Sequence, residues 1–412
     1  MLGPFLFLST KKAHPMLMSL MDVLDIVDCK SVATSHMEDI QHRFLERNRG
    51  LLQLVLAAAD ESLRQNTLSI YNELDDLSRA RVLLSAELGE IFAGLGEPNR
   101  TYAENVAASA PRLYALVAGE HAIAQLELGR HTPYLDGESR PDIWSPLADR
   151  VAKYIDGSWQ VIRSMNVGGC ITLDFDSPLA TRTDPTSGVM SQPRLVMDHE
   201  ERSTLQCKLD AALDMIDAIE PTYGVLIRNF TRRIIVRKSA ETLARAAANG
   251  RRFSSEHSSN QRGVIKLLNF HFPEKSAGAC TESLLHESLH VMLASYEHFT
   301  SSFTSRQRAT RPVSPWSGNL IPNSSLSHAI FIYYACHRLF NIGASSDSPL
   351  FDVVKSEMRA KIQHFAAGFL ISQPLSKLFV DSSPIGAELQ EVLDLMQRRT
   401  RAFYLERCQG VD

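Results

Sequence analysis

Apolar residues recur at helical spacing from about residue 15 to residue 130, without strand-like alternation. The pattern Ser35 to Glu38 is a capping box and predicts the start of a helix. A second helix is predicted over residues 67–95, and a third opens at the box Thr101 to Glu104 and runs to about Gly129. We therefore expect this half of the chain to form a helical layer.

A turn-rich stretch over residues 131–146 ends this pattern, and mixed elements follow it. The predicted elements are strands at 167–173, 233–237 and 263–270, a helix at 200–219, and helices over the last hundred residues. The expected fold is α+β and mostly helical, with an N-terminal helical layer, a zincin-like strand–helix core and C-terminal helices. We expect a helical region at residues 1–145 and a mixed α/β metal-binding catalytic region at residues 146–412.

Composition excludes several classes of protein. The formal net charge is −4 and no dense basic block is present, so binding to duplex nucleic acid is not expected. No run approaches the roughly 18 to 20 apolar residues that cross a bilayer, so no membrane partner is expected. The six cysteines are widely spaced without a Cys-x-x-Cys pair, which indicates a reducing cytoplasm rather than a disulfide scaffold.

The chemistry is concentrated in a predicted helix that follows the strand at 263–270. His286 and His290 are four residues apart, so on a helix their imidazoles project from one face and can converge on one metal ion. Glu287 lies about 100° further round, which suits an acid/base or hydrogen-bonding role better than direct ligation. An apolar ridge on another face can be buried: Leu285, Leu289, Met292 and Tyr296.

A mononuclear site needs a third ligand. Leu293 and Tyr296 stand where the extended metzincin pattern requires Gly and His, so that class is excluded. A carboxylate ligand would have to come from Glu297, only seven residues after His290, or from the more distant Glu357. The better candidate is His328, near the start of an apolar predicted helix, although a lone histidine there is also compatible with a hydrogen-bonded core residue.

A resemblance supports His328. The segments at 253–265, 282–290, 314–316 and 326–331 occur in the order seen in the HExxH-motif peptide-modification enzymes of ribosomal-peptide clusters. The Ser-Pro-Trp at 314–316, followed by a histidine at a helix start, is the most specific part of it. This family is also described as 2-oxoglutarate-dependent HExxH-type peptide β-hydroxylases. The resemblance covers roughly residues 230–345, and it departs from the family at Ser317 and Ile321, where basic residues are common.

The resemblance implies that His286, His290 and His328 bind Fe(II) and that 2-oxoglutarate is the co-substrate. It further implies hydroxylation at Cβ of a residue in a ribosomally made peptide, with Glu287 acting from outside the ligand sphere and Trp316 lining the cofactor pocket. Three protein ligands leave room for a bidentate co-substrate and oxygen. A cation should hold the distal carboxylate, and the sequence does not choose among four arginines: Arg306, Arg308, Arg311 and Arg338.

Two other functions remain open. A zinc metallopeptidase would use Glu287 as the general base for a Zn(II)-bound water. A non-catalytic helical module with a degenerate site is the third interpretation. In each of them the helical region at 1–145 could serve in peptide recognition, with a leader or carrier attached to the peptide.

Overall fold

The computed structural model describes residues 18–135, 141–239, 253–300, 303, 311–347, 354–379 and 385–409. It is a mixed α+β protein in which helices predominate, as expected from the sequence. None of the described helices combines the length and the apolar character needed to cross a membrane.

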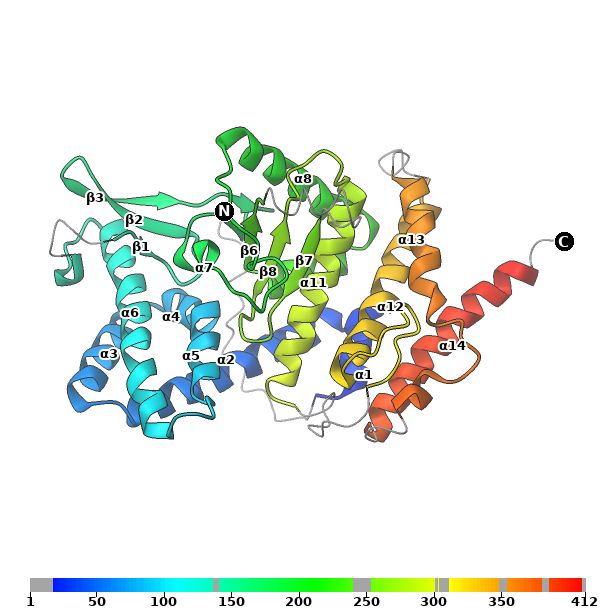
Figure 1. The fold of residues 1–412 in the computed structure, drawn as a ribbon, viewed down its shortest axis with the longest axis horizontal. Coiled ribbons are helices and arrows are strands. Elements are labelled where there is room, and N and C mark those ends of the chain that lie inside the picture. The colour runs from blue at the N-terminus through cyan, green and yellow to red at the C-terminus, as the bar shows by residue number, and fades with distance from the viewer. Residues whose placement is uncertain are drawn as a thin grey trace. The chain divides into compact units, whose positions relative to one another are not determined.

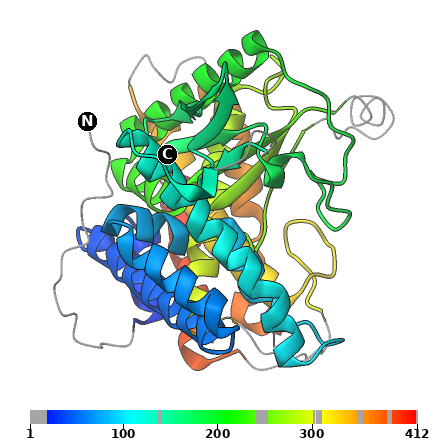
Figure 2. The ribbon, with the colours of Figure 1, turned by 90° about the vertical axis from the view of Figure 1, so that its left-hand side faces the viewer.

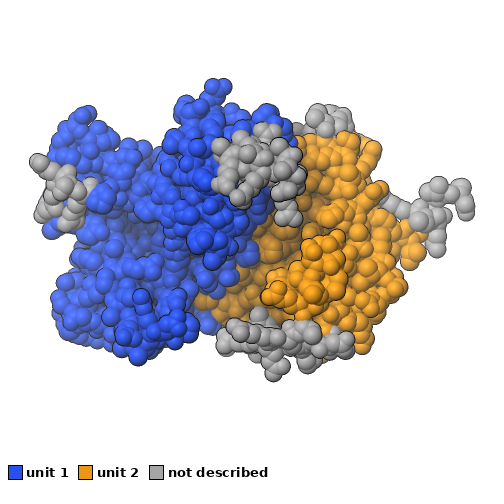
Figure 3. All heavy atoms as spheres, in the orientation of Figure 1, with its two compact units in different colours: residues 1–8, 42–210, 228–275 blue, residues 9–41, 211–227, 276–412 orange. Residues whose placement is uncertain are grey.

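The described chain divides into two compact units, coloured separately in Figure 3. Unit 1 contains residues 42–210 and 228–275, and unit 2 contains residues 18–41, 211–227 and 276–409. Each unit is therefore assembled from segments that are not contiguous in the sequence. The expected boundary at 145/146 falls inside unit 1, so the functional division into residues 1–145 and 146–412 does not follow the compact units and stays a prediction.

Unit 1 begins with helices that pack around a shared apolar cluster, which includes Leu52, Leu88 and Val117. The helices are α2 (Ala33–Ala57, shared with unit 2), α3 (Glu61–Glu73), α4 (Asp76–Leu83), α5 (Ala86–Gly94) and α6 (Tyr102–Glu127). The capping box at Thr101 is confirmed, because its hydroxyl accepts from the Glu104 amide and that carboxylate accepts from the Thr101 amide. The helix predicted to follow the box at Ser35 is present as α2, but it already begins at Ala33, so Ser35 lies inside the helix and is not its N-cap.

The single helix predicted over 67–95 is wrong, because the structure has three helices there. The cause is local capping: the carboxylate of Asp75 accepts from the Ser78 amide and starts α4, and the hydroxyl of Ser85 accepts from the Leu88 amide and starts α5. Each cap ends the preceding helix while the apolar periodicity continues. Hydrophobic spacing alone therefore did not reveal the two breaks.

Unit 1 also contains two sheets (Figure 1). The smaller is antiparallel in the order β1-β2-β3, made of β1 (Ile143–Trp144), β2 (Arg150–Ile155) and β3 (Ser158–Arg163). The larger has the order β4-β5-β6-β8-β7 and comprises β4 (Asn166–Val167), β5 (Ile171–Asp174), β6 (Arg233–Arg237), β7 (Ser254–His257) and β8 (Val264–Leu268). Strands β5, β6 and β8 are parallel, and both edge strands are antiparallel to their neighbours.

The three strands predicted in this region are present, with one modification. The first is divided into β4 and β5 by Gly168 and Gly169, which both adopt positive φ and form a turn. The predicted helix at 200–219 is α8 (His199–Ile219), which continues into unit 2. The short helices η2 (Pro133–Leu135) and α7 (Pro178–Thr181) complete unit 1.

Unit 2 is helical. Its elements are α1 (Leu20–Val27), α9 (Pro221–Phe230, shared with unit 1), α11 (Ala277–Glu297), α12 (Asn323–Ser345), α13 (Lys355–Ala367), η4 (Leu375–Phe379) and α14 (Ala387–Gln409). Helix α12 packs against α11, α13, α14 and α1 and so forms the centre of the unit. The helices predicted for the C-terminal hundred residues are confirmed.

Candidate metal centre

Helix α11 carries the His-Glu-x-x-His motif, and its N-terminus is firmly anchored. Ser276 caps the helix by accepting from the Ala279 amide at 3.0 Å, and its hydroxyl donates to Glu357 Oε2 of α13 at 2.7 Å. A Cβ at Gly278 would lie 2.8 Å from the same carboxylate oxygen, so a larger residue there would displace the Glu357 side chain. These contacts fix the start of α11 against α13 within unit 2.

The back of α11 is buried as the sequence predicted. All four residues of the expected ridge are at most 1% exposed: Leu285, Leu289, Met292 and Tyr296. The Tyr296 hydroxyl donates to the backbone carbonyl of Met18 at 3.2 Å. Burial of this face leaves the histidine pair on a half-buried face of the same helix.

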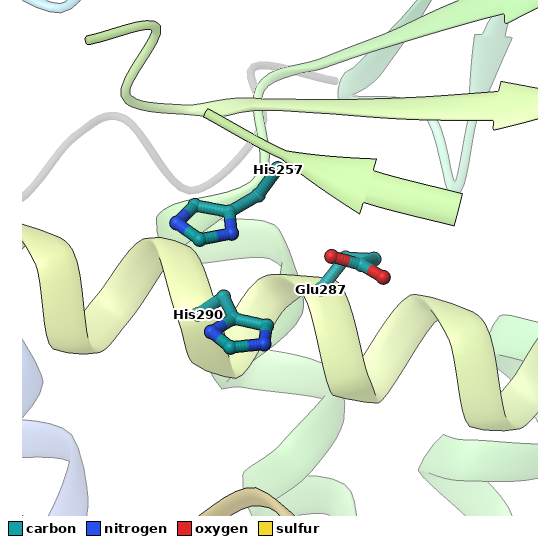
Figure 4. Close-up of side chains that lie close together, drawn as sticks. All are labelled: His257, Glu287 and His290. Atoms are coloured by element: carbon teal, nitrogen blue, oxygen red, sulfur yellow. The ribbon is translucent and has the colours of Figure 1, made fainter. Parts of the chain in front are cut away.

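His286 and His290 lie one above the other, with ring centroids 5.1 Å apart. The intervening Glu287 is 4% exposed, and one of its carboxylate oxygens lies within 4.8 Å of a ring nitrogen of His290. Figure 4 shows these two side chains on neighbouring turns of α11. His257, also labelled there, belongs to β7 of unit 1.

The candidate third ligand, His328, is brought to the motif by α12. Its Nδ1 lies 3.4 Å from Nδ1 of His290, and the two ring centroids are 5.6 Å apart. His328 is 6% exposed, and Phe303 meets its ring edge-to-face at 5.3 Å. The sequence separation of 38 residues between the two histidines is therefore closed by the packing of α12 on α11.

His290 lies between the other two predicted ligands, but the three histidines do not converge on one point. Among the described residues of unit 2, one nitrogen from each of His286, His290 and His328 cannot be chosen so that all three lie within 4.8 Å of one another. The close pair is His290 with His328, while His286 is adjacent to His290 and to Tyr333, whose ring centroid is 6.1 Å away. Ligation of one ion by all three would therefore require at least one of these side chains to move.

Glu297, at the last turn of α11, lies beside His328, whereas the sequence suggested it only as a possible carboxylate ligand of the metal. Its Oε2 lies 3.3 Å from Nε2 of His328. Nε2 of His328 and Oε1 of Glu297 are both buried, and neither has an aligned hydrogen bond in the described part of the chain. The available signal was spacing, because Glu297 follows His290 by seven residues, two helical turns on the same face.

Trp316 is connected to the histidines through Tyr333, whose ring neighbours both Trp316 and His286. Residues 313–320 form a tight loop closed by the Val313 to Leu320 bridge. In this loop the Trp316 ring packs on Tyr333 at 4.7 Å between centroids, and its indole N–H donates to the Phe365 carbonyl at 2.9 Å. Trp316 thus supports Tyr333 beside His286, and burial raises the pKa of that tyrosine. Its predicted contact with a cofactor stays a prediction.

The four candidate arginines for binding 2-oxoglutarate differ in their surroundings. Arg306 and Arg308 lie outside the described residues. Arg338 is engaged elsewhere in unit 2, since it donates to the Asp28 carbonyl at 3.0 Å and pairs with the Asp28 side chain at 3.6 Å. Arg311 is exposed. Of the two described arginines, Arg338 is therefore the weaker candidate as a cation for 2-oxoglutarate.

Other potential ligands near the helices are accounted for. His337 interacts with the hydroxyl of Tyr404 at 3.2 Å, and His298 is the C-terminal cap residue of α11. Cys280 and Cys336 are fully buried, as expected from the sequence. Burial raises the pKa of Cys336 well above its ordinary value, so it is a thiol at neutral pH.

Comparison with known proteins adds no homologue: the chain matches no family model and no curated protein.

Proposed function

We propose that unit 2 carries the metal centre of an Fe(II)- and 2-oxoglutarate-dependent oxygenase that hydroxylates Cβ of a residue in a ribosomally made peptide. The observation that supports the proposal best is the 3.4 Å contact between Nδ1 of His290 and Nδ1 of His328. It joins the His-Glu-x-x-His helix to the one histidine that the family resemblance singles out. Bound Fe(II) would supply the activation of oxygen, with 2-oxoglutarate as the reductant.

The donor atoms fit a metal ion. Two nitrogens that each lie about 2.0 to 2.1 Å from one ion are about 2.9 Å apart at a right angle and about 3.4 Å apart at a tetrahedral angle. The observed 3.4 Å lies in this range, and imidazole nitrogens suit both iron and zinc. Geometry therefore supports a shared ion without selecting the metal.

The surrounding residues would hold the ligands in place. Glu297 Oε2 lies 3.3 Å from Nε2 of His328, and a hydrogen bond formed between them would fix the tautomer that leaves Nδ1 with its lone pair. The Phe303 ring restricts rotation of His328. Glu287 is buried next to His290 and can hold a proton or accept a hydrogen bond from a bound water or substrate.

The zincin-like core remains part of this proposal. Along the chain β8 is followed by α11, the order in which a zincin places a strand before its ligand helix. The buried carboxylate of Glu287 beside His290 also favours a second candidate, a zinc metallopeptidase with Glu287 as general base.

Metal and co-substrate binding distinguish the two candidates. We expect the anaerobic protein to bind Fe(II) and to develop a weak charge-transfer absorption band when 2-oxoglutarate is added. Oxygen should then yield succinate. His290→Ala should abolish the band, whereas the control His42→Ala, an exposed histidine on α2, should leave it unchanged.

A different set of results would identify a zinc peptidase. Cleavage of casein with bound zinc, lost in Glu287→Gln while the metal is retained, and no 2-oxoglutarate-dependent band would overturn the oxygenase and support the peptidase.

A further inference from the structure

Unit 1 contains a cavity that the proposed metal chemistry does not use. Its volume is about 490 Å³, within the range of about 300 to 1,000 Å³ that is common for small-molecule sites. It is lined by α5, α6, α7 and β1, and Figure 2 shows α6 in cyan across the front of these elements. The site lies wholly within unit 1.

The walls of the cavity are mainly apolar and aromatic. Trp144 and Tyr134 contribute rings, and Ile91, Leu116 and Leu179 contribute aliphatic side chains. Trp144 is half-buried, and its neighbour on α6 is Gly119, where a Cβ would lie 3.5 Å from the Trp144 carbonyl oxygen. An apolar ligand body of moderate size would therefore be enclosed by these side chains.

One side of the cavity carries a carboxylate oxygen without a hydrogen-bond partner in the described chain. Arg233 donates to two carboxylates at once, to Glu87 Oε1 at 2.8 Å and to Asp174 Oδ2 at 2.7 Å. One guanidinium thus faces two carboxylates, while Arg182, which also interacts electrostatically with Glu87, is hydrogen-bonded to Glu90. Of these oxygens, Glu87 Oε2 is buried and has no hydrogen-bond partner among the described residues, and Glu87 lines the cavity.

The neighbouring carboxylate, that of Glu90, lies close to two guanidiniums. Glu90 accepts from Arg182 at 2.8 Å and from Gln261 at 2.7 Å, and Arg112 lies 3.6 Å away. Burial of Glu90 would raise its pKa, but these hydrogen bonds and both guanidiniums outweigh burial and lower it, so the carboxylate is ionised. Arg182 also interacts electrostatically with Glu87 and Asp184. Arg112 is the more exposed of the two guanidiniums, at 53% of its side chain, and is the one that a ligand can reach.

The two groups are close enough to act on one small ligand. Glu87 and Glu90 are one helical turn apart on α5, so their Cβ atoms are about 5 to 6 Å apart. The third acidic residue of the lining, Asp142, is already paired with Lys153 at 3.0 Å. The lining is therefore apolar, with the unpartnered carboxylate oxygen of Glu87 and the exposed guanidinium of Arg112 at its edge.

We propose that this cavity binds a zwitterionic small molecule with an apolar or aromatic body, the chemistry of a free aromatic amino acid. The ammonium group is held by Glu87 and the carboxylate by Arg112, while the side chain packs against Trp144 and Leu116. A short peptide with both ends free presents the same chemistry over a longer span.

The test uses the full chain labelled with 5-fluorotryptophan. The sequence has three tryptophans, so the fluorine spectrum has three signals, and Trp144→Phe identifies that of Trp144. L-Phenylalanine should shift the Trp144 signal saturably. Phenethylamine and 3-phenylpropionate each lack one charge and should bind about tenfold or more weakly. Phenylalanyl-phenylalanine distinguishes a free amino acid from a peptide: stronger binding than L-phenylalanine would identify a peptide as the ligand.

Two charge variants should separate the contributions of Glu87 and Arg112. Glu87→Gln should weaken L-phenylalanine and phenethylamine but leave 3-phenylpropionate unchanged, and Arg112→Gln should weaken L-phenylalanine and 3-phenylpropionate but leave phenethylamine unchanged. Ala115→Phe, at an exposed position of the lining on α6, should block all ligands, whereas Ala107→Phe, exposed on the same helix but outside the lining, should block none. If Glu87→Gln does not fold, the variants at Arg112 and Ala115 still decide the question.

The proposal is overturned by any of three results. These are no saturable shift of the Trp144 signal up to about 10 mM L-phenylalanine, a range that covers weak affinities, binding that Ala115→Phe does not reduce, or equal affinity for L-phenylalanine and both analogues. The readout involves neither metal nor oxygen, so its outcome is independent of the function proposed for unit 2.

Discussion

Removal of the His328 imidazole is the most direct perturbation of the candidate metal centre. If His290 and His328 share an ion, His328→Ala deletes a direct ligand whose nitrogen lies 3.4 Å from its partner. Loss of a residue that merely supports a ligand already costs about 10- to 100-fold in metal affinity. We therefore expect the dissociation constant for Fe(II) to rise by about 100-fold or more.

This change has a calculable effect on stability. A metal present at 100 times its dissociation constant stabilises the folded protein by about 2.7 kcal/mol. At the same metal concentration, a 100-fold weaker site gains only about 0.4 kcal/mol. The metal-dependent part of the free energy of unfolding should thus fall by about 2.3 kcal/mol in His328→Ala.

Anaerobic urea unfolding with and without Fe(II) measures this difference. His337→Ala is the matched control, because it removes a histidine nine residues later on α12 that interacts with Tyr404 and not with the motif. The control should lower stability equally with and without metal. Equal metal-dependent stabilisation of wild type and His328→Ala would refute the shared ion, as would a wild type that Fe(II) does not stabilise.

Three further changes test other parts of the structure. Glu287→Gln should leave the Fe(II) content unchanged by elemental analysis, because we assign Glu287 no direct ligation; loss of metal would make it a ligand. Gly368→Ala would place a Cβ 2.2 Å from Trp316 and should lower the free energy of unfolding by about 1 to 3 kcal/mol and shift tryptophan emission to the red; unchanged emission would contradict this contact. Arg150→Met leaves Glu120, which is 0% exposed, without its closest cation and should cost about 3 to 5 kcal/mol near neutral pH. Burial raises the pKa of Glu120 even beside Arg150, so protonation removes the unpaired charge more readily in the folded than in the unfolded protein. The loss of stability caused by Arg150→Met should therefore become smaller when urea unfolding is repeated at lower pH. A loss of stability that grows on acidification would contradict this sign.

The elements that the sequence predicted well are those in which local pattern and packing agree. Helix α6 begins at a capping box that needs only Thr101 and Glu104, and α11 combines a cap with an apolar ridge that is buried. The sheet of β1, β2 and β3 was not predicted, although the sequence carries a signal for it. Apolar and polar residues alternate at the start of β3, and Asp156 and Gly157, both with positive φ, form the hairpin turn between β2 and β3.

The division into units could not be predicted from local pattern. Helices α2, α8 and α9 each contribute residues to both units, so no turn-rich linker marks the change. The breaks at Asp75 and Ser85 show the same limitation on a smaller scale, because a cap interrupts a helix without interrupting its apolar periodicity. A shift in composition reveals a linker, but neither the boundary between the units nor the helix breaks at Asp75 and Ser85 is a linker.

In the candidate site, one contact between histidines follows from local helix geometry and the other from tertiary packing. His286 and His290 are neighbours because of helical spacing alone, whereas the approach of His328 depends on how α12 packs on α11. The distances at the two nitrogens of His328 are 3.4 Å to His290 and 3.3 Å to Glu297. With about 2 Å across an imidazole, they span about 9 Å, close to the rise of about 10.5 Å over the seven residues from His290 to Glu297. A single ring from α12 can therefore present one nitrogen to each of two side chains two turns apart on α11. This arrangement suits Glu297 to positioning the ring of His328 rather than to binding the metal.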